Sequence, residues 1–238
     1  MIDESFIKKI CELSDTKIIE VEGRQYSSGT LQPVFKPRPN HIGVNTLEGF
    51  ADYIEANIDG LRKEDLIIHI LDFNRVDLFS KLTGDFPARD TYIVAGSAPL
   101  KFNFGNYYDI ESFNISMQSQ FIQDSETALI LQIVGNVKEE AVRNFSDDGV
   151  TQEVTVKQGV SRVAAVPVPN PVTLRPFRTF FEVEQPASKF VFRMRSAKDG
   201  QPPACALFEA DGGKWKQEAI ENIARWLRIK ITDISIIS

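Results

Sequence analysis

The stretch VTLRPFRTFFEVEQPASKFVFRMRSAKDGQPPACALFEADGGKWKQEAIENIARWL, residues 172–227, decides how this chain folds. Residues 177–183 and 189–195 alternate and are rich in aromatic and β-branched side chains, which predicts two half-buried strands. Residues 185–188 predict the turn between them, because their proline fixes φ and has no N–H for a strand ladder. After a short third strand, apolar residues at helical spacing predict an amphipathic helix, which we expect to cover the phenylalanine face of the hairpin. This apolar stripe consists of Trp215, Ala219, Ile223 and Trp226.

The predicted hairpin register brings arginines together on one face. With residues 185–188 as the loop, Arg178 lies opposite Arg195, and Arg193 lies on the same face beside Phe180. Like charges that face each other across a sheet are destabilising. Because a sequence rarely keeps such an arrangement without compensation, Arg178, Phe180, Arg193 and Arg195 are the candidate binding residues.

Two interpretations of this arginine face stay open. In the first, Glu182 and Glu184 neutralise the arginines, whose stems only cover apolar neighbours. In the second, the face receives an anion, because an arginine fork suits phosphate or carboxylate. An aromatic ring among the arginines could also stack a base of a single strand. The ligand is then single-stranded nucleic acid, a nucleotide, or an acidic protein surface.

The composition is that of an ordinary globular chain. Its 238 residues suit one large domain or two small ones, and 42% hydrophobic with 25% charged residues are typical values. A net charge of −6 argues against general affinity for nucleic acid or anionic membranes, although it permits a local basic face. With two cysteines, no signal peptide and no long apolar run, we expect a cytoplasmic protein without membrane contact.

The whole chain predicts an α+β fold with mixed, largely antiparallel sheets and amphipathic helices packed on one face. Residues 66–71 are nearly all apolar and predict a strand covered on both faces. The proline-rich residues 167–171 divide the chain into an N-terminal α/β region, 1–166, and a C-terminal region of three strands plus helix, 167–238, unless the chain is one compact domain. Other expected elements are a helix from Glu4 to Leu13, a strand from Lys17 to Glu22, a helix capped by Asn45, helices that start at Asp109 and Ser125, and a strand from Val150 to Lys157; the Ser125 segment also suits a strand.

The C-terminal tail, residues 228–237, carries isoleucines that alternate weakly. Such a terminal strand either closes its own sheet or adds to the edge of a neighbour's sheet. On this basis we predict a homo-oligomer.

Groups that catalysis needs are scarce. His41 and His69 are the only histidines, and neither they nor the two cysteines have the spacing of a zinc site. Residues 212–214, GGK, lack the spacing and the hydroxyl of a P-loop and indicate a glycine entry into a helix. Residues 147–149, DDG, favour a turn over a metal site. We therefore expect no catalytic residues, no metal and no cofactor.

Several phrases of the chain are similar to those of a known family. They are NTLEGF at residues 45–50, FNISMQS at 113–119, SDDGV at 146–150, RTFFEVEQP at 178–186 and ALFEADGGKWK at 206–216. The chain resembles an uncharacterised early-region protein family of tailed bacteriophages and prophages of low-GC bacteria. This resemblance implies a viral origin and expression in a bacterial cytoplasm, but it supplies no mechanism.

The sequence thus predicts a non-enzymatic phage protein that acts by binding or self-assembly, with an accessory role early in infection. Two alternatives stay open: a binder of single-stranded nucleic acid or nucleotides that uses the arginine face, and a hydrolase or nuclease. The expected partners are further copies of the chain, single-stranded nucleic acid, a nucleotide or a host protein.

Overall fold

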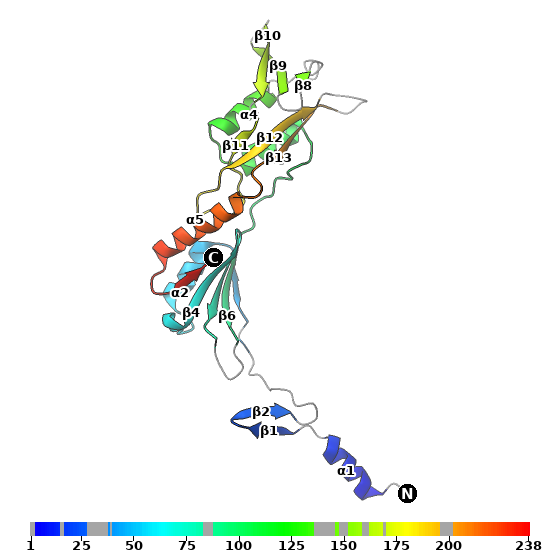
Figure 1. Cartoon of the computed structure of the whole chain (residues 1–238), viewed down its shortest axis with the longest axis vertical. Helices are drawn as coiled ribbons and strands as arrows, with labels where there is room; N and C mark the ends of the chain where they lie inside the picture. The colour runs from blue at the N-terminus through cyan, green and yellow to red at the C-terminus, as the bar shows by residue number, and fades with distance from the viewer. Residues whose placement is uncertain are drawn as a thin grey trace.

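The structure is a computed structural model, and it describes residues 3–14, 17–27, 38, 40–82, 88–135, 146–147, 152–158, 162–168, 170–195 and 202–238. Helices and mixed or antiparallel sheets occur together, so the predicted α+β class is confirmed. Two sheets with their own helices form two lobes, one above the other in Figure 1. Among the described residues, no helix is long and apolar enough to cross a membrane.

The first lobe contains a five-stranded mixed sheet. Its strand order is β14 (Ser235–Ile237), β4 (Leu66–Asp72), β5 (Arg75–Ser80), β6 (Thr91–Gly96) and β3 (Ile42–Val44). The outer strands β14 and β3 run parallel to their neighbours, whereas β4, β5 and β6 are antiparallel. Helices α2 (Leu47–Ala56) and α5 (Trp215–Lys230) pack on one face and close its core. A short 3₁₀ helix, Lys63–Asp65, precedes β4.

Strand β4 is covered on one face, and the prediction that both of its faces are buried is wrong. Leu66, Ile68 and Ile70 are buried toward the helices, while His69 is only half-buried and Leu71 is 52% exposed. Among the described residues, both helices of this lobe pack on the same face of the strand, the face that carries Leu66, Ile68 and Ile70.

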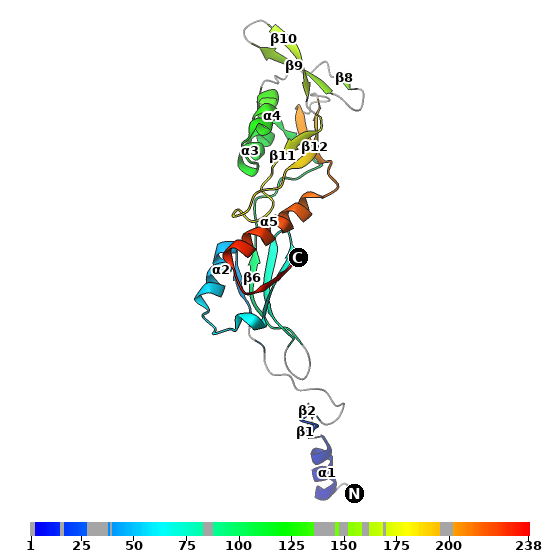
Figure 2. The same ribbon diagram turned by 60° about the vertical axis from the view of Figure 1, so that its left-hand side comes forward.

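The second lobe contains a four-stranded antiparallel sheet. Its strand order is β11 (Val172–Leu174), β12 (Ser188–Arg195), β13 (Ala204–Glu209) and β7 (Tyr108–Asp109). Helices α3 (Ile110–Gln120) and α4 (Ser125–Gly135) lie next to each other against this sheet, as Figure 2 shows. Their buried side chains and the inner face of β12 form a second core that is rich in phenylalanine. The Ser125 segment is therefore a helix.

The predicted hairpin between residues 177–183 and 189–195 does not form. Strand β12 exists and alternates as predicted, but its partners are β11 and β13. Residues 177–183 form no strand, and Arg195 pairs with Ala204. The arginine pair across the sheet is therefore absent, because the segment that carries Arg178 is a loop.

Helix α5 forms where predicted, but it covers the five-stranded sheet and not the phenylalanine face of β12. Strand β14 follows it and pairs with β4, so the C-terminal tail closes the sheet of its own chain. Each of the two cores contains side chains from before residue 166 and from after residue 167. The predicted boundary between residues 166 and 167 therefore does not separate the two cores. Pro167 itself lies in strand β10 (Arg162–Val168).

The remaining elements lie at the two ends of the molecule in Figure 1. Near one end are helix α1 (Glu4–Ser14) and the hairpin of β1 (Ile18–Val21) and β2 (Arg24–Ser27), and near the other end is a sheet of β8 (Ser146–Asp147), β9 (Gln152–Gln158) and β10. Helix α1 and the first hairpin agree with the predictions, and helix α1 has no buried residue. Part of the predicted SDDG turn lies outside the described residues.

Candidate functional site

A cavity of about 310 Å³ lies where the two lobes meet. Its walls come from the β4–β5 turn, the segment after β6, the end of α3, the loop after β11, the end of β13 and the start of α5. The lining residues are Phe73, Asn74, Ser97, Pro99, Lys101, Phe102, Phe104, Gln120, Pro176, Phe177, Arg178, Glu209, Trp215 and Lys216. Five of these fourteen residues are aromatic, and we refer to the cavity as the Arg178 cavity.

The loop of residues 175–187 brings Arg178 to the cavity, and the buried side chain of Gln185 fixes the shape of this loop. The Gln185 Oε1 accepts hydrogen bonds from the backbone N–H groups of Arg178 at 2.9 Å and Thr179 at 3.3 Å. Its Nε2 donates to the carbonyl groups of Phe180 at 2.8 Å and Val183 at 3.3 Å. One side chain thus satisfies the backbone groups that a strand partner would otherwise bind.

The same loop is attached to elements of the first lobe. The Thr179 hydroxyl donates to the carbonyl oxygen of Phe73 in the β4–β5 turn. The Glu182 carboxylate accepts from the backbone N–H of Leu47, 2.8 Å away, at the start of α2, where a negative charge favours the helix dipole. Thr46 is the N-cap of this helix, and its side chain accepts from the N–H of Gly49, so the predicted cap at Asn45 is wrong by one residue. These contacts hold the loop against the first lobe.

The guanidinium of Arg178 lies between aromatic rings. Its central carbon is 4.5 Å from the ring centre of Phe104, 4.4 Å from that of Trp215 and 5.1 Å from that of Phe190. Its Nη1 is 3.0 Å from the Glu209 carboxylate. The Arg178 side chain is only 8% exposed, so the surrounding rings remove almost all of its contact with water.

Two nitrogens of Arg178 have no hydrogen-bond partner among the residues that the structure describes. They are Nε and Nη2, both shielded from solvent, whereas Nη1 contacts Glu209 and, at 3.5 Å, the Ser188 hydroxyl. Burial lowers the pKa of the guanidinium to about 10, against the opposing effect of the Glu209 and Asp211 carboxylates. The group therefore carries its charge at neutral pH in an environment that disfavours the charge. An unpaired buried donor costs about 1–3 kcal/mol, and more for a charged group.

The charged side chains around the cavity favour an anion. Lys101 and Lys216 line it together with Arg178, and both lysines are exposed. The Glu209 carboxylate opposes them and is already paired with Arg178. With Asp211, which lies close enough to influence the pKa of Arg178, the five groups sum to one positive charge. Two further buried polar atoms of lining residues, the Trp215 Nε1 donor and the Gln120 Oε1 acceptor, lack a partner within the described part of the chain.

Of the four predicted site residues, only Arg178 lines the cavity. Phe180 is 1% exposed and belongs to the core of the first lobe, so its ring is not available to stack a base. Arg193 and Arg195 lie on the outer face of β12, as the alternation predicted, and Arg195 lies over the ring of Tyr107. The four residues therefore form no common face. The residues that surround Arg178 in their place come from segments that sequence reasoning did not connect.

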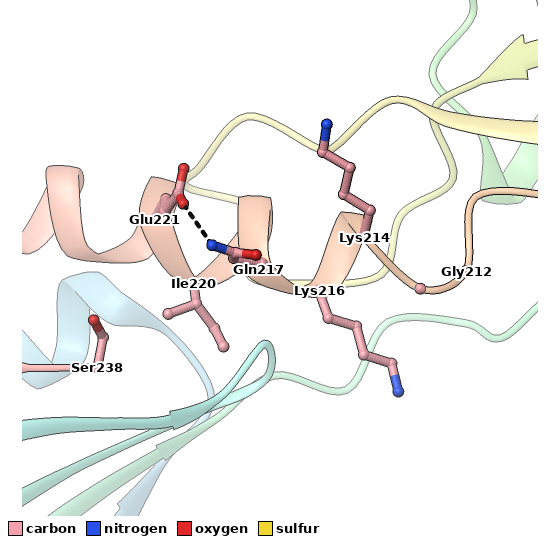
Figure 3. Close-up of a pocket in the computed structure, with 8 residues that line it drawn as sticks. Gly212, Lys214, Lys216, Gln217, Ile220, Glu221 and Ser238 are labelled. Atoms are coloured by element: carbon pink, nitrogen blue, oxygen red, sulfur yellow. Dashed lines mark hydrogen bonds between the residues drawn. The ribbon is translucent and has the colours of Figure 1, made fainter.

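A wider depression of about 580 Å³ runs along the start of α5 and past Ser238. Figure 3 shows Lys214 and Lys216 pointing away from each other there, while Gln217 donates to Glu221 at 3.3 Å. No lining side chain of this depression has a buried polar atom without a partner. The depression therefore lacks the feature that distinguishes the Arg178 cavity. The glycines that precede Trp215 have positive φ and lead into α5, as the sequence predicted.

The residues that metal or nucleophilic chemistry would use lie apart from the Arg178 cavity. Cys205 is fully buried in the second core, and burial raises the pKa of its thiol to about 12. His69 lies on β4 beside the ring of Phe79. Within the described part of the chain, no group of three or more His, Cys, Asp or Glu residues is placed to hold a metal ion. No protein-family model, curated protein or solved structure matches this chain.

Proposed function

We propose that this protein acts by binding, without catalysis, and that its ligand carries an anionic group that Arg178 holds. The observation behind this proposal is the buried guanidinium with two unpartnered N–H donors in an aromatic cavity. A buried cation is expensive, and a fold retains it most simply when a charge-assisted hydrogen bond to a ligand offsets that cost. The two exposed lysines at the same cavity would attract the anion as it approaches.

Inorganic phosphate is the simplest probe of this proposal. Titration calorimetry at low salt should show phosphate binding to the wild type, and Arg178→Gln should weaken it about tenfold or more, because a hydrogen bond to a charged group contributes about 1.5–3 kcal/mol. Arg175→Gln is the matched control, since Arg175 belongs to the same loop but contacts Glu184 on the surface. Equal affinity in all three proteins, or no binding to the wild type, would refute an anion site at Arg178.

Self-association is a second candidate function, and it rests on the N-terminal residues 3–27. Helix α1 exposes Phe6, Ile7, Ile10 and Leu13, each at least 50% accessible. An isolated helix of this length and an isolated two-stranded hairpin are both marginal in water. Light scattering of the full chain and of a chain without residues 1–27 tests this candidate: a monomer in both cases excludes it. The phage origin rests on the sequence resemblance alone.

A further inference from the structure

The unpartnered edge of Arg178 determines the shape of the anion that fits. The Nε and Nη2 hydrogens of a guanidinium point in the same direction and form one fork, which matches the two oxygens of a carboxylate or phosphate. Nη1, on the other side of the group, already contacts Glu209 and Ser188. The geometry of the fork therefore matches an anion with two oxygens in one plane.

The faces of the same guanidinium are already covered. Phe104 and Trp215 lie over it at 4.5 and 4.4 Å, in the range of a cation–π contact. A ligand thus binds Arg178 through its edge and not by stacking on its plane. Because Nε and Nη2 are closed to solvent, the side chains over this edge must move aside when the ligand enters. The ligand's anionic group must then project from a body that occupies the rest of the cavity.

The rest of the cavity is suited to a flat ring. Phe73, Phe102 and Phe177 contribute further aromatic walls, and Phe73 meets Trp215 edge to face, with ring centres 4.8 Å apart. A volume of about 310 Å³ is at the lower limit of small-molecule sites, so it suits one ring with its substituent and not several nucleotides. The unpartnered Trp215 donor and Gln120 acceptor would pair with heteroatoms on such a ring.

We infer that the Arg178 cavity binds a single flat heteroaromatic ring that carries a carboxylate or a phosphate group. This inference rests on the proposed anion-binding function and adds the ring to it. Pyrimidine carboxylates carry the anionic group on the ring itself, and nucleoside monophosphates carry it on the ribose that is attached to the ring. The aromatic walls would hold the ring while Arg178 binds the oxygens, and the exposed Lys101 and Lys216 would meet any additional charge.

Titration calorimetry with five small probes tests the ring separately from the anion. Acetate has the carboxylate alone, benzamide has the ring without the charge, and benzoate has both; orotate and uridine 5′-monophosphate add ring heteroatoms to a carboxylate and a phosphate. We expect benzoate and orotate to bind about tenfold more tightly than acetate, and benzamide not to bind. The ratio of orotate to uridine monophosphate affinity then identifies the carboxylate or the phosphate as the preferred group.

Variants locate the ring within the cavity. Phe177→Leu should weaken benzoate about fivefold and weaken inorganic phosphate less, whereas Phe6→Leu, on the exposed helix α1, should change neither. Fluorescence provides a second measurement that does not depend on how well Phe177→Leu folds. Orotate should quench tryptophan emission in wild type and in Trp226→Phe, which lies outside the cavity lining, but not in Trp215→Phe.

The possible results separate the two proposals. If acetate and phosphate bind through Arg178 as tightly as benzoate and orotate do, the ring inference is overturned and the anion site stands. If none of these anions binds to the wild type, both are overturned. If an oligodeoxythymidylate of eight residues binds much more tightly than uridine monophosphate, the ligand is a nucleic-acid strand and the single-ring inference is wrong.

Discussion

Replacement of Arg178 by methionine distinguishes a ligand-binding arginine from a structural one. Methionine keeps an unbranched side chain of similar length, and its thioether makes favourable contacts with aromatic rings. The replacement removes the charge, the two unpartnered donors and the contact with Glu209. Because Glu209 is 42% exposed, its carboxylate returns to water and is not left as a buried, unpaired charge.

The expected change in unfolding free energy for Arg178→Met follows from two opposing contributions. Burial lowers the pKa of Arg178 from the usual value of an arginine to about 10. At 1.36 kcal/mol per pH unit, the folded state therefore disfavours the charged guanidinium by about 3 kcal/mol. Cation–π contacts stabilise the charged guanidinium by about 0.5–1 kcal/mol for each of the rings of Phe104, Phe190 and Trp215. Since these contributions nearly cancel, we expect the unfolding free energy of Arg178→Met to lie within about 1 kcal/mol of the wild-type value.

The pKa of Arg178 determines how the stability difference between wild type and Arg178→Met depends on pH. The folded pKa of Arg178 lies below its unfolded pKa, so the unfolded chain holds more protons above about pH 10, and the stability of the wild type rises with pH there. Below about pH 9 the arginine is charged in both states. The stability difference between wild type and Arg178→Met should therefore stay constant from pH 6 to pH 8.

Urea unfolding followed by circular dichroism measures the difference in unfolding free energy between wild type and Arg178→Met. The comparison requires that both proteins have the same slope m, the dependence of the unfolding free energy on urea concentration. Arg175→Met serves as the control, because it removes an exposed arginine of the same loop. A melting temperature within about 4 °C of wild type, together with lost phosphate binding, is the expected result. If Arg178→Met loses more than about 3 kcal/mol, the arginine holds the lobes together, and the argument for a binding role is refuted.

Three further predictions concern the loop of residues 175–187 and the cysteines. Gln185→Leu should cost about 2–4 kcal/mol in urea unfolding, because it removes the Gln185 hydrogen bonds of the Arg178 and Thr179 N–H groups and of the Val183 carbonyl, whereas the Phe180 carbonyl still accepts from Val183. It should also abolish phosphate binding; stability equal to wild type would contradict the role of Gln185. Glu182→Gln should lower stability by about 0.3–1 kcal/mol at low salt and less at high salt, since it removes the charge at the start of α2; an effect independent of salt would argue against this helix-dipole contact. A thiol reagent at pH 8 should modify exposed Cys11 in the folded chain and Cys205 only in urea, since Cys205 is buried with a pKa of about 12; two rapidly reacting thiols in the folded protein would contradict its burial.

The sequence predicted the elements whose pattern is local. The stripe of α5, the alternation of β12 and the start of α3 at Asp109 depend on neighbouring residues, and the structure confirms all three. Partners of these elements were harder to predict, because hydrophobic periodicity identifies a buried face but not the surface that covers it. Helix α5 shows this difference: its apolar stripe is as predicted, but it packs on the five-stranded sheet and not on β12.

Within the loop of residues 175–187, residues 177–183 were predicted to be a strand because they alternate and are rich in aromatic side chains. The two prolines of the loop, Pro176 and Pro186, were a signal against a long paired strand, since each lacks a backbone donor. The role of Gln185 has no local pattern, because its side chain replaces a strand partner only after the loop has folded around it. The cavity could not be predicted from the sequence either, because its walls come from segments that lie more than a hundred residues apart in the chain.

The same loop explains why Arg178 was selected for a wrong reason and still lies at the candidate site. The predicted register placed Arg178 opposite another arginine, whereas the structure places its guanidinium among aromatic rings, where the side chain is almost completely buried. In both cases the sequence keeps a cation where folding alone gains little from it. Departures from the rules of stable packing tend to occur at functional positions, where a binding partner offsets their cost. Because Gln185, Thr179 and Glu182 fix the loop through contacts that do not use the guanidinium, the fold can position Arg178 without depending on it.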